Sequence, residues 1–316
     1  MLRRLTISAG LLLCGVAGAA AEGAPREAFV TNQLSDNLSI VDLTTMTAAP
    51  PIAIGGKPAG IALSPDGNEA YLASPDSKEV VFVDAVKRVV SHRLKVGDGP
   101  LGIAVNPKSG MIYVADWYKQ RLLSIDPATR KQSGAVDVGN APSGIAVTPD
   151  GALILSSDRE SDSVSVIDAA TFKRLDGIKV GEHPFGLTIS ADGRRAYTAN
   201  VQSNDVTVID IAARKIIATV KTGRRPYAIA IAKGRAYVTN QGSGTVTVFD
   251  IETHAVIKTI PVGEYPEGIA ATPDGSAVYV ACWSDNTLER IDTGAMEVKA
   301  RVTVGDGPRA FGAFLR

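Results

Sequence analysis

Apolar and polar residues alternate with a period of two through most of this chain, in short runs bounded by Gly, Pro, Asp and Asn. Runs such as "VTVID" at 206–210 and "AYVTN" at 236–240 are rich in Val, Ile, Thr and Tyr. This pattern predicts short β-strands rather than helices. Triplets such as "PDG" at 149–151 separate a first run from a second and predict tight turns.

The pattern repeats along the chain with a period of 40 or 42 residues. A proline precedes the first run of each unit, and an aspartate ends the third run. The prolines are Pro58, Pro100, Pro142, Pro184, Pro226, Pro266 and Pro308. The aspartates are Asp42, Asp84, Asp126, Asp168, Asp210, Asp250 and Asp292. Each unit holds four runs, A to D in chain order, and a four-stranded repeat of this length is typical of β-propellers.

The two ends of the chain predict how the ring closes. The first run, 27–32, corresponds to strand B of a unit, and the last, 309–316, corresponds to strand A. We therefore expect an all-β, seven-bladed β-propeller of four-stranded antiparallel blades, closed by the C-terminal strand completing the N-terminal blade. Closure of this kind removes open sheet edges.

The tetrad "YVTN" at 237–240, with variants at 29–32 and 197–200, resembles the YVTN-repeat seven-bladed β-propeller family of bacteria and archaea. The resemblance covers nearly all of the chain after residue 21. It implies the propeller fold but no single activity, because the family includes binding proteins, surface-layer proteins and lactonase-like relatives.

The first 21 residues have the three parts of a secretory signal peptide. Arg3 and Arg4 precede an apolar run, and Ala19 and Ala21 mark a cleavage site after residue 21. We expect residues 1–21 to be removed, leaving 22–316 as a single propeller domain. The mature protein is then expected to be periplasmic or secreted, monomeric and not inserted in a membrane.

Charge and cysteine content narrow the function further. The chain has 33 basic and 33 acidic residues, which disfavours nucleic acid as the main partner. Signal cleavage leaves Cys282 as the single cysteine, expected to be a small packed residue. No motif for a cofactor or metal is recognised, so neither a cofactor nor a metal is expected.

The repeated aspartates are interpreted as turn caps. Close packing of strands at the axis is the interpretation of the repeated glycines Gly60, Gly102, Gly144, Gly186 and Gly268.

Residues that vary within the repeat are the better functional candidates. In an up-and-down blade the D-to-A and B-to-C connections share one face. Most D-to-A loops are small, including "GDGPR" at 305–309, but three consecutive ones at 181–185, 223–227 and 263–267 are not. They supply His183, Phe185, Arg225, Tyr227, Tyr265 and Glu267. The B-to-C turns add Trp117, Tyr118, Arg159 and Trp283 on the same face.

These residues predict a surface with aromatic walls and with Arg225 or Arg159 as anion anchors. The simpler interpretation is solvated charge, with aromatics that shield strand ends. The leading function is a non-catalytic binding propeller for a protein partner or a small anionic ligand. One alternative is a lactonase-like hydrolase, with His183 as base, Glu182 or Glu267 beside it and Arg225 as oxyanion contact. Another is an accessory protein of a periplasmic quinoprotein or cytochrome oxidation system.

Overall fold

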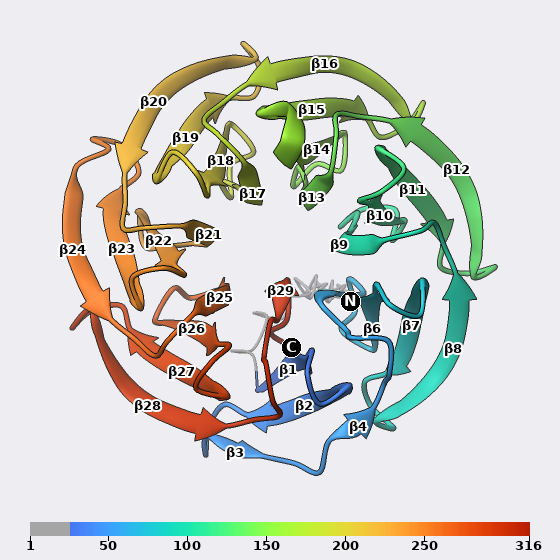
Figure 1. The fold of residues 1–316 in the computed structure, drawn as a ribbon, viewed down its shortest axis with the longest axis horizontal. Coiled ribbons are helices and arrows are strands. Elements are labelled where there is room, and N and C mark those ends of the chain that lie inside the picture. Colours follow the sequence, from blue (N-terminus) through green and yellow to red (C-terminus); the bar gives the residue numbers. More distant parts are fainter. Residues whose placement is uncertain (1–25) are drawn as a thin grey trace, which may run out of the picture.

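The computed structural model describes residues 26–316, and the expected signal peptide lies outside the described residues. Seven β-sheets form a closed ring, as Figure 1 shows. The prediction of an all-β, seven-bladed propeller is therefore confirmed. The single helical element described is the short 3-10 helix η1 (Arg159–Ser161). No helix in the described part of the chain is long and apolar enough to span a bilayer.

In blades 2 to 7 the strands follow the predicted order, and successive strands pair antiparallel. Blade 1 holds β1 (Glu27–Asn32), β2 (Asn37–Asp42), β3 (Thr47–Ala48) and β4 (Ile52–Ala53). Its two short outer strands, β3 and β4, both pair with β2. Blade 2 holds β5 (Gly60–Leu63), β6 (Glu69–Ser74), β7 (Glu79–Asp84) and β8 (Val89–Lys95). Blade 3 holds β9 (Pro100–Val105), β10 (Ile112–Asp116), β11 (Arg121–Asp126) and β12 (Lys131–Asp137). Blade 4 holds β13 (Pro142–Val147), β14 (Leu153–Asp158), β15 (Ser163–Asp168) and β16 (Lys173–Lys179).

The remaining three blades repeat the same plan. Blade 5 holds β17 (Pro184–Ile189), β18 (Arg195–Asn200), β19 (Asp205–Asp210) and β20 (Lys215–Lys221). Blade 6 holds β21 (Pro226–Ala232), β22 (Arg235–Asn240), β23 (Thr245–Asp250) and β24 (Val256–Pro261). Blade 7 holds β25 (Pro266–Ala271), β26 (Ala277–Cys282), β27 (Thr287–Asp292) and β28 (Glu297–Thr303). The first strand of a complete blade lies at the axis and the fourth at the rim (Figure 1).

The C-terminal segment completes blade 1, as predicted. It runs antiparallel to β1, with bridges from Asn32 to Pro308 and from Ala28 to Leu315. The Phe29 N–H donates to the Phe314 carbonyl at 2.8 Å. Beyond the backbone pairing, the side chain of Phe314 is fully buried in the core of this blade. Residues from the two ends of the chain therefore share one sheet.

The middle of this segment departs from a regular inner strand. β29 (Phe311–Gly312) leaves β1 and pairs parallel with Gly60 and Ile61 of β5. Two left-handed residues flank Phe311, with φ of 44° at Ala310 and 132° at Gly312. They bend the chain toward the axis, where β29 lies in Figure 1.

The repeated aspartates act as turn caps, in agreement with the sequence interpretation. Asp168 ends β15, and its Oδ1 accepts hydrogen bonds from the Thr171 hydroxyl and N–H, each at 2.7 Å. These bonds lower the pKa of Asp168, because they stabilise the carboxylate. The seven aspartates are therefore part of the blade frame.

The asparagine of the "YVTN" tetrad also has a structural role. Asn240 ends β22, and its Nδ2 donates to Thr245 Oγ1 at 3.0 Å and Thr247 Oγ1 at 2.8 Å on β23. Asn200 makes the equivalent bonds to Asp205 and Thr207 in blade 5. In blade 7 the position is Cys282, which is fully buried, and burial raises the pKa of its thiol. Cys282 is the packed residue that the sequence predicts.

The axial glycines are required by packing. A Cβ at Gly102 would collide with the backbone carbonyl of Ser143 in the next blade, and Gly144 meets Phe185 in the same way. Gly60 and Gly186 are equally close to the following blade. Adjacent axial strands approach each other backbone to backbone, so no side chain fits there. The packing interpretation of these glycines is confirmed.

Closure by the C-terminal segment predicts a large stability effect from a position near the end of the chain. We expect Phe314→Ala to lower the free energy of unfolding by about 3–5 kcal/mol, because it leaves a cavity in the closed blade. Chemical denaturation followed by circular dichroism would measure it. The control is Ile217→Ala on the rim strand β20, where Ile217 is 46% exposed. A Phe314→Ala effect no larger than that of the control would contradict closure by this segment.

Candidate functional site

The residue after each repeat proline lies close to the beginning of an axial segment, on the face of the D-to-A and B-to-C connections. In blades 2 to 4 this position holds a small or aliphatic residue. In blades 5 to 7 and in the C-terminal segment that completes blade 1, it holds an aromatic or charged residue. In order, the residues at this position are Ala59, Leu101, Ser143, Phe185, Tyr227, Glu267 and Arg309. One register position of the repeat thus supplies most of the candidate site.

Four aromatic residues, Phe185, Tyr227, Phe311 and Trp117, pack together at this end of the axis, and we call them the aromatic plug. The Phe185 ring lies 4.3 Å from Tyr227 and 5.0 Å from Phe311, centroid to centroid. Trp117 contacts Phe185 at 6.4 Å from its B-to-C turn. Phe185, Tyr227 and Phe311 are each buried. The plug therefore fills the end of the axis on which the sequence placed the binding surface.

A buried charged network packs against the aromatic plug. Arg309 Nε donates to Glu267 Oε2 at 2.7 Å, and Gln241 Nε2 donates to Glu267 Oε1, also at 2.7 Å. Arg309 Nη2 also donates to the hydroxyl of Tyr227. The side chain of Glu267 is 6% exposed and that of Arg309 is 16% exposed. Both oxygens of Glu267 are thus engaged within the protein.

The pKa directions in this network follow from burial and charge. Burial raises the pKa of Glu267, and the nearby Arg309 charge offsets part of that shift. Burial acts to lower the pKa of Arg309, but the interactions with Glu267 and Tyr227 together outweigh it and raise the pKa, so the guanidinium remains charged. Burial also raises the pKa of Tyr227, which keeps its hydroxyl neutral. The network is a buried ion pair with a neutral phenol beside it.

Two further arginines approach the same centre. The Arg159 guanidinium lies 5.9 Å from the centre of the Trp117 ring and also pairs with Glu160. Arg159 is close enough to Tyr227 for its charge to act on the phenol, and exposed Arg225 acts in the same way on Glu267. The guanidinium groups of Arg159 and Arg309 therefore lie against the aromatic plug, and the charge of Arg225 reaches Glu267 beside it.

A rigid loop frame holds the variable D-to-A residues. His183, Arg225 and Tyr265 each precede a repeat proline, and their φ angles are 54°, 54° and 53°. The previous B-to-C turn stabilises this left-handed conformation. The His183 N–H donates to Asp162 Oδ1 at 2.9 Å, and the Arg225 N–H to Asn204 Oδ1 at 2.7 Å. The side chains therefore start from fixed backbone positions.

The other predicted residues are placed around the plug or apart from it. His183 Nε2 lies 3.7 Å from Glu160 Oε2. Because Glu160 also pairs with Arg159, His183 lies next to that ion pair. Tyr265 and Trp283 pack against each other at 6.2 Å and form a separate aromatic pair. Tyr118 is 69% exposed. The site thus unites Phe185, Tyr227, Glu267, Trp117, Arg159 and Arg225.

Two of the residues suggested for hydrolysis lie in different surroundings. Glu267 is bound by Arg309 and Gln241, so both of its oxygens are engaged and it balances the charge of Arg309. His183, the base that the sequence suggests, lies beside Glu160, and its buried Nδ1 has no hydrogen-bond partner among residues 26–316. Hydrolysis with His183 as base stays a prediction.

Arg309 and Phe311 are the functional candidates that sequence reasoning missed. The loop at 305–309 was grouped with the small loops because its first residues are small. The grouping was incorrect for the site, because Arg309 follows Pro308 just as Tyr227 follows Pro226. That shared register was the available signal. Phe311 enters the plug through the bend of β29, which the repeat does not encode.

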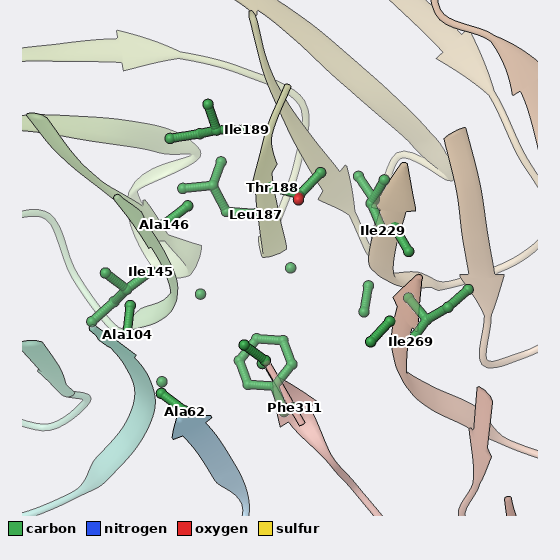
Figure 2. Close-up of a pocket in the computed structure, with 18 of the residues that line it drawn as sticks. Ala62, Ala104, Ile145, Ala146, Leu187, Thr188, Ile189, Ile229, Ile269 and Phe311 are labelled. Carbon is green, nitrogen blue, oxygen red and sulfur yellow. The ribbon is translucent and has the colours of Figure 1, made fainter. Parts of the chain in front are cut away.

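A separate cavity occupies the axis on the other side of the plug. Its volume is about 460 Å³, and its walls are the axial strands of blades 2 to 7 together with 311–313. Figure 2 shows Phe311 among its lining residues, with Ile145, Leu187 and Ile229 around it. Phe311 is the single plug residue that lines it, and none of the residues predicted for the site does so.

Comparison with known proteins agrees with this architecture. A family model described as YNCE-like beta-propeller matches residues 75–233, just over half of the chain. The chain belongs to the YNCE-like beta-propeller family. This assignment and the seven blades fit the predicted resemblance to YVTN-type propellers.

Solved structures share the fold of this YNCE-like propeller at low sequence identity. Kuenenia stuttgartiensis hydrazine synthase matches with a TM-score of 0.77 and 20% identity, over 88% of this chain and 99% of that one. A functionally unknown protein from Desulfotomaculum acetoxidans matches with a TM-score of 0.78 and 16% identity, over 90% and 99% of the two chains. No curated protein matches the sequence. These similarities concern the fold alone.

The Arg309–Glu267 pair predicts a strong and pH-dependent stability effect. We expect Arg309→Met to lower the free energy of unfolding by about 3–5 kcal/mol at pH 8, because the buried carboxylate loses its partner. The folded-state pKa of Glu267 is already raised and would rise further in this variant. Glu267 then binds a proton more readily in the folded variant than in the unfolded chain. The free energy of unfolding of the variant therefore falls as the pH rises above the ordinary pKa of Glu.

The loss relative to wild type should therefore be smaller near pH 5 than at pH 8 in denaturant titrations. Arg194→Met on the opposite face is the matched control, because the Arg194 side chain is 84% exposed. It should change stability by less than about 0.5 kcal/mol. An Arg309→Met loss that is equal at both pH values would show that Glu267 is not the group left unpaired.

Proposed function

We propose that this YNCE-like propeller is a non-catalytic binding protein that recognises an anionic small molecule at the aromatic plug. The binding surface is the centre of the face formed by the D-to-A and B-to-C connections. The placement of Arg159 over Trp117 and of Arg309 beside Tyr227 in one aromatic cluster is the observation that carries this proposal.

The charge balance at this centre favours an anion. Arg309 is neutralised by buried Glu267, and Arg159 is partly neutralised by Glu160. Arg225 is exposed, and the Arg159 side chain retains 27% exposure. Both can therefore turn N–H donors toward a ligand. Guanidinium groups bind carboxylate and phosphate groups with paired hydrogen bonds.

The aromatic residues give the surface a second means of recognition. Trp117 is half-buried between Arg159 and Phe185, so part of its ring faces solvent. A planar or ring-containing anion can stack on such a surface while its charged groups contact the arginines. The ligand class proposed is therefore an anion that carries a flat apolar part.

Binding rather than catalysis is favoured because the buried carboxylate at this centre, Glu267, is already paired. Glu267 is held by two donors, and His183 is next to Glu160. The face offers positioned cations and aromatic rings, which are the elements of a recognition site.

A thermal-shift screen of residues 22–316 against aromatic di- and tricarboxylates, including a quinone cofactor, tests this proposal. A ligand at a hundred times its Kd adds about 2.7 kcal/mol to stability. For a domain of this size we expect a rise in Tm of several degrees. The combined variant Arg159→Ala with Arg225→Ala should lose the shift and keep its unliganded Tm within a few degrees.

Arg194→Ala on the opposite face serves as the matched control and should keep the shift. The same panel should include lactones and short single-stranded DNA as competing classes. A hit that survives in the double arginine variant would place the binding site elsewhere. If the wild type hydrolyses a lactone and His183→Ala does not, the function is hydrolysis and the binding proposal is wrong.

A further inference from the structure

We propose that the axial cavity is a second binding site, which takes a small uncharged molecule with a mostly apolar surface. The molecule would enter from the face of the A-to-B turns, opposite the aromatic plug. The inference is independent of the anionic ligand proposed above, because Phe311 is the one residue that the two sites share.

The position of the cavity follows from the register of the axial strands. Its walls begin at the packed glycines Gly102, Gly144 and Gly186 and continue to the ends of the axial strands. Ala191, in the A-to-B turn of blade 5, lies at the outer limit. The volume of about 460 Å³ lies within the usual range of small-molecule sites.

The cavity has one closed end. Phe311 forms part of its wall and also contacts Phe185 and Tyr227 in the plug. Leu187 and Ile189 are only half-buried, which shows that solvent reaches the cavity from the other end. A ligand in this space would therefore be enclosed by side chains from several blades and by the ring of Phe311.

The lining selects against charge. Its side chains are Ala, Val, Ile, Leu and Phe, and Thr188 provides the one polar side chain among them (Figure 2). A carboxylate or ammonium group placed here would lose its hydration without gaining a charged partner. That desolvation cost is large compared with the gain from apolar contact. A neutral ligand avoids it.

The backbone nevertheless offers hydrogen bonds. Each axial strand from β9 to β25 pairs with a neighbour on one side only, as in the order β13-β14-β15-β16. Alternate N–H and C=O groups of such a strand point away from its partner, toward the axis. Together with the Thr188 hydroxyl, they can bind one or two neutral polar groups such as a carbonyl or a hydroxyl. The occupant is therefore apolar in its body and uncharged in its polar groups.

A pair of fluorescent probes tests both the site and its charge selection. N-phenyl-1-naphthylamine and 8-anilino-1-naphthalenesulfonate share one ring system, but the second carries a sulfonate. We expect the neutral probe to bind residues 22–316 with one-to-one stoichiometry. The anionic probe should bind at least tenfold more weakly at this site. The two probes are also compared in the double variant Arg159→Ala with Arg225→Ala, which lacks the proposed anion site. Equal binding of the two probes to that variant, or no binding of the neutral one, would overturn the proposal.

Cavity-filling variants locate the bound probe. Ala104 and Ala146 are half-buried lining residues on β9 and β13. Ala104→Phe and Ala146→Phe should each lower the affinity for the neutral probe tenfold or more, while the Tm of each variant stays within a few degrees of the wild-type value. Two separate variants are used so that the misfolding of one does not remove the test.

Ala212→Phe is the matched control, because Ala212 is exposed in the C-to-D turn on the same face and does not line the cavity. It should bind the neutral probe like wild type. Wild-type affinity in a folded Ala104→Phe or Ala146→Phe variant would overturn the assignment to the cavity. The double variant Arg159→Ala with Arg225→Ala should also bind the probe normally, which separates this site from the proposed anion site.

Discussion

Pairing of the C-terminal strand with β1 is the constraint on which the rest of the structure depends. A ring of sheets has no free end only if the last segment completes the first blade. The backbone bonds from Phe29 to Phe314 and from Arg309 to Thr31 fulfil this condition. The ion pair of Arg316 with Glu27, at 2.6 Å, reinforces it at the outer end. The same segment holds Arg309 and Phe311 at the axis, so the strand pairing that closes the ring also positions two residues of the site.

The repeat divides the residues into a frame and a variable set. Turn aspartates, strand-end asparagines and axial glycines recur because every blade has the same backbone geometry to satisfy. The position after the repeat proline differs from blade to blade at the end of the axis. Ala59 and Ser143 are small and fully buried there, whereas Phe185 and Tyr227 supply aromatic rings. Variation at one register position thus generates an asymmetric site on a symmetric scaffold.

This division also explains how much could be predicted from the sequence. Strands, blade number and closure follow from the period-two pattern and the repeat, and each was confirmed by the structure. Phe185, Tyr227 and Glu267 were identified because they depart from the repeat. Arg309 was missed because its loop was judged by its small residues rather than by register. The bend that inserts Phe311 depends on the φ angles of Ala310 and Gly312. The pairing of Glu267 with Arg309 depends on the C-terminal segment lying beside the axial strand of blade 7. Local sequence does not contain either relation.

Amide hydrogen exchange of the C-terminal strand tests the closure most directly. The amides of Arg309 and Arg316 donate to Thr31 and Glu27 of the first strand, each at 2.8 Å. The account predicts that peptides covering 309–316 exchange as slowly as peptides from the buried strands β14 and β18, since opening the ring exposes a whole blade. Exchange of 309–316 within seconds, while those strands stay protected, would show that the ring is not closed by this segment and would contradict the account.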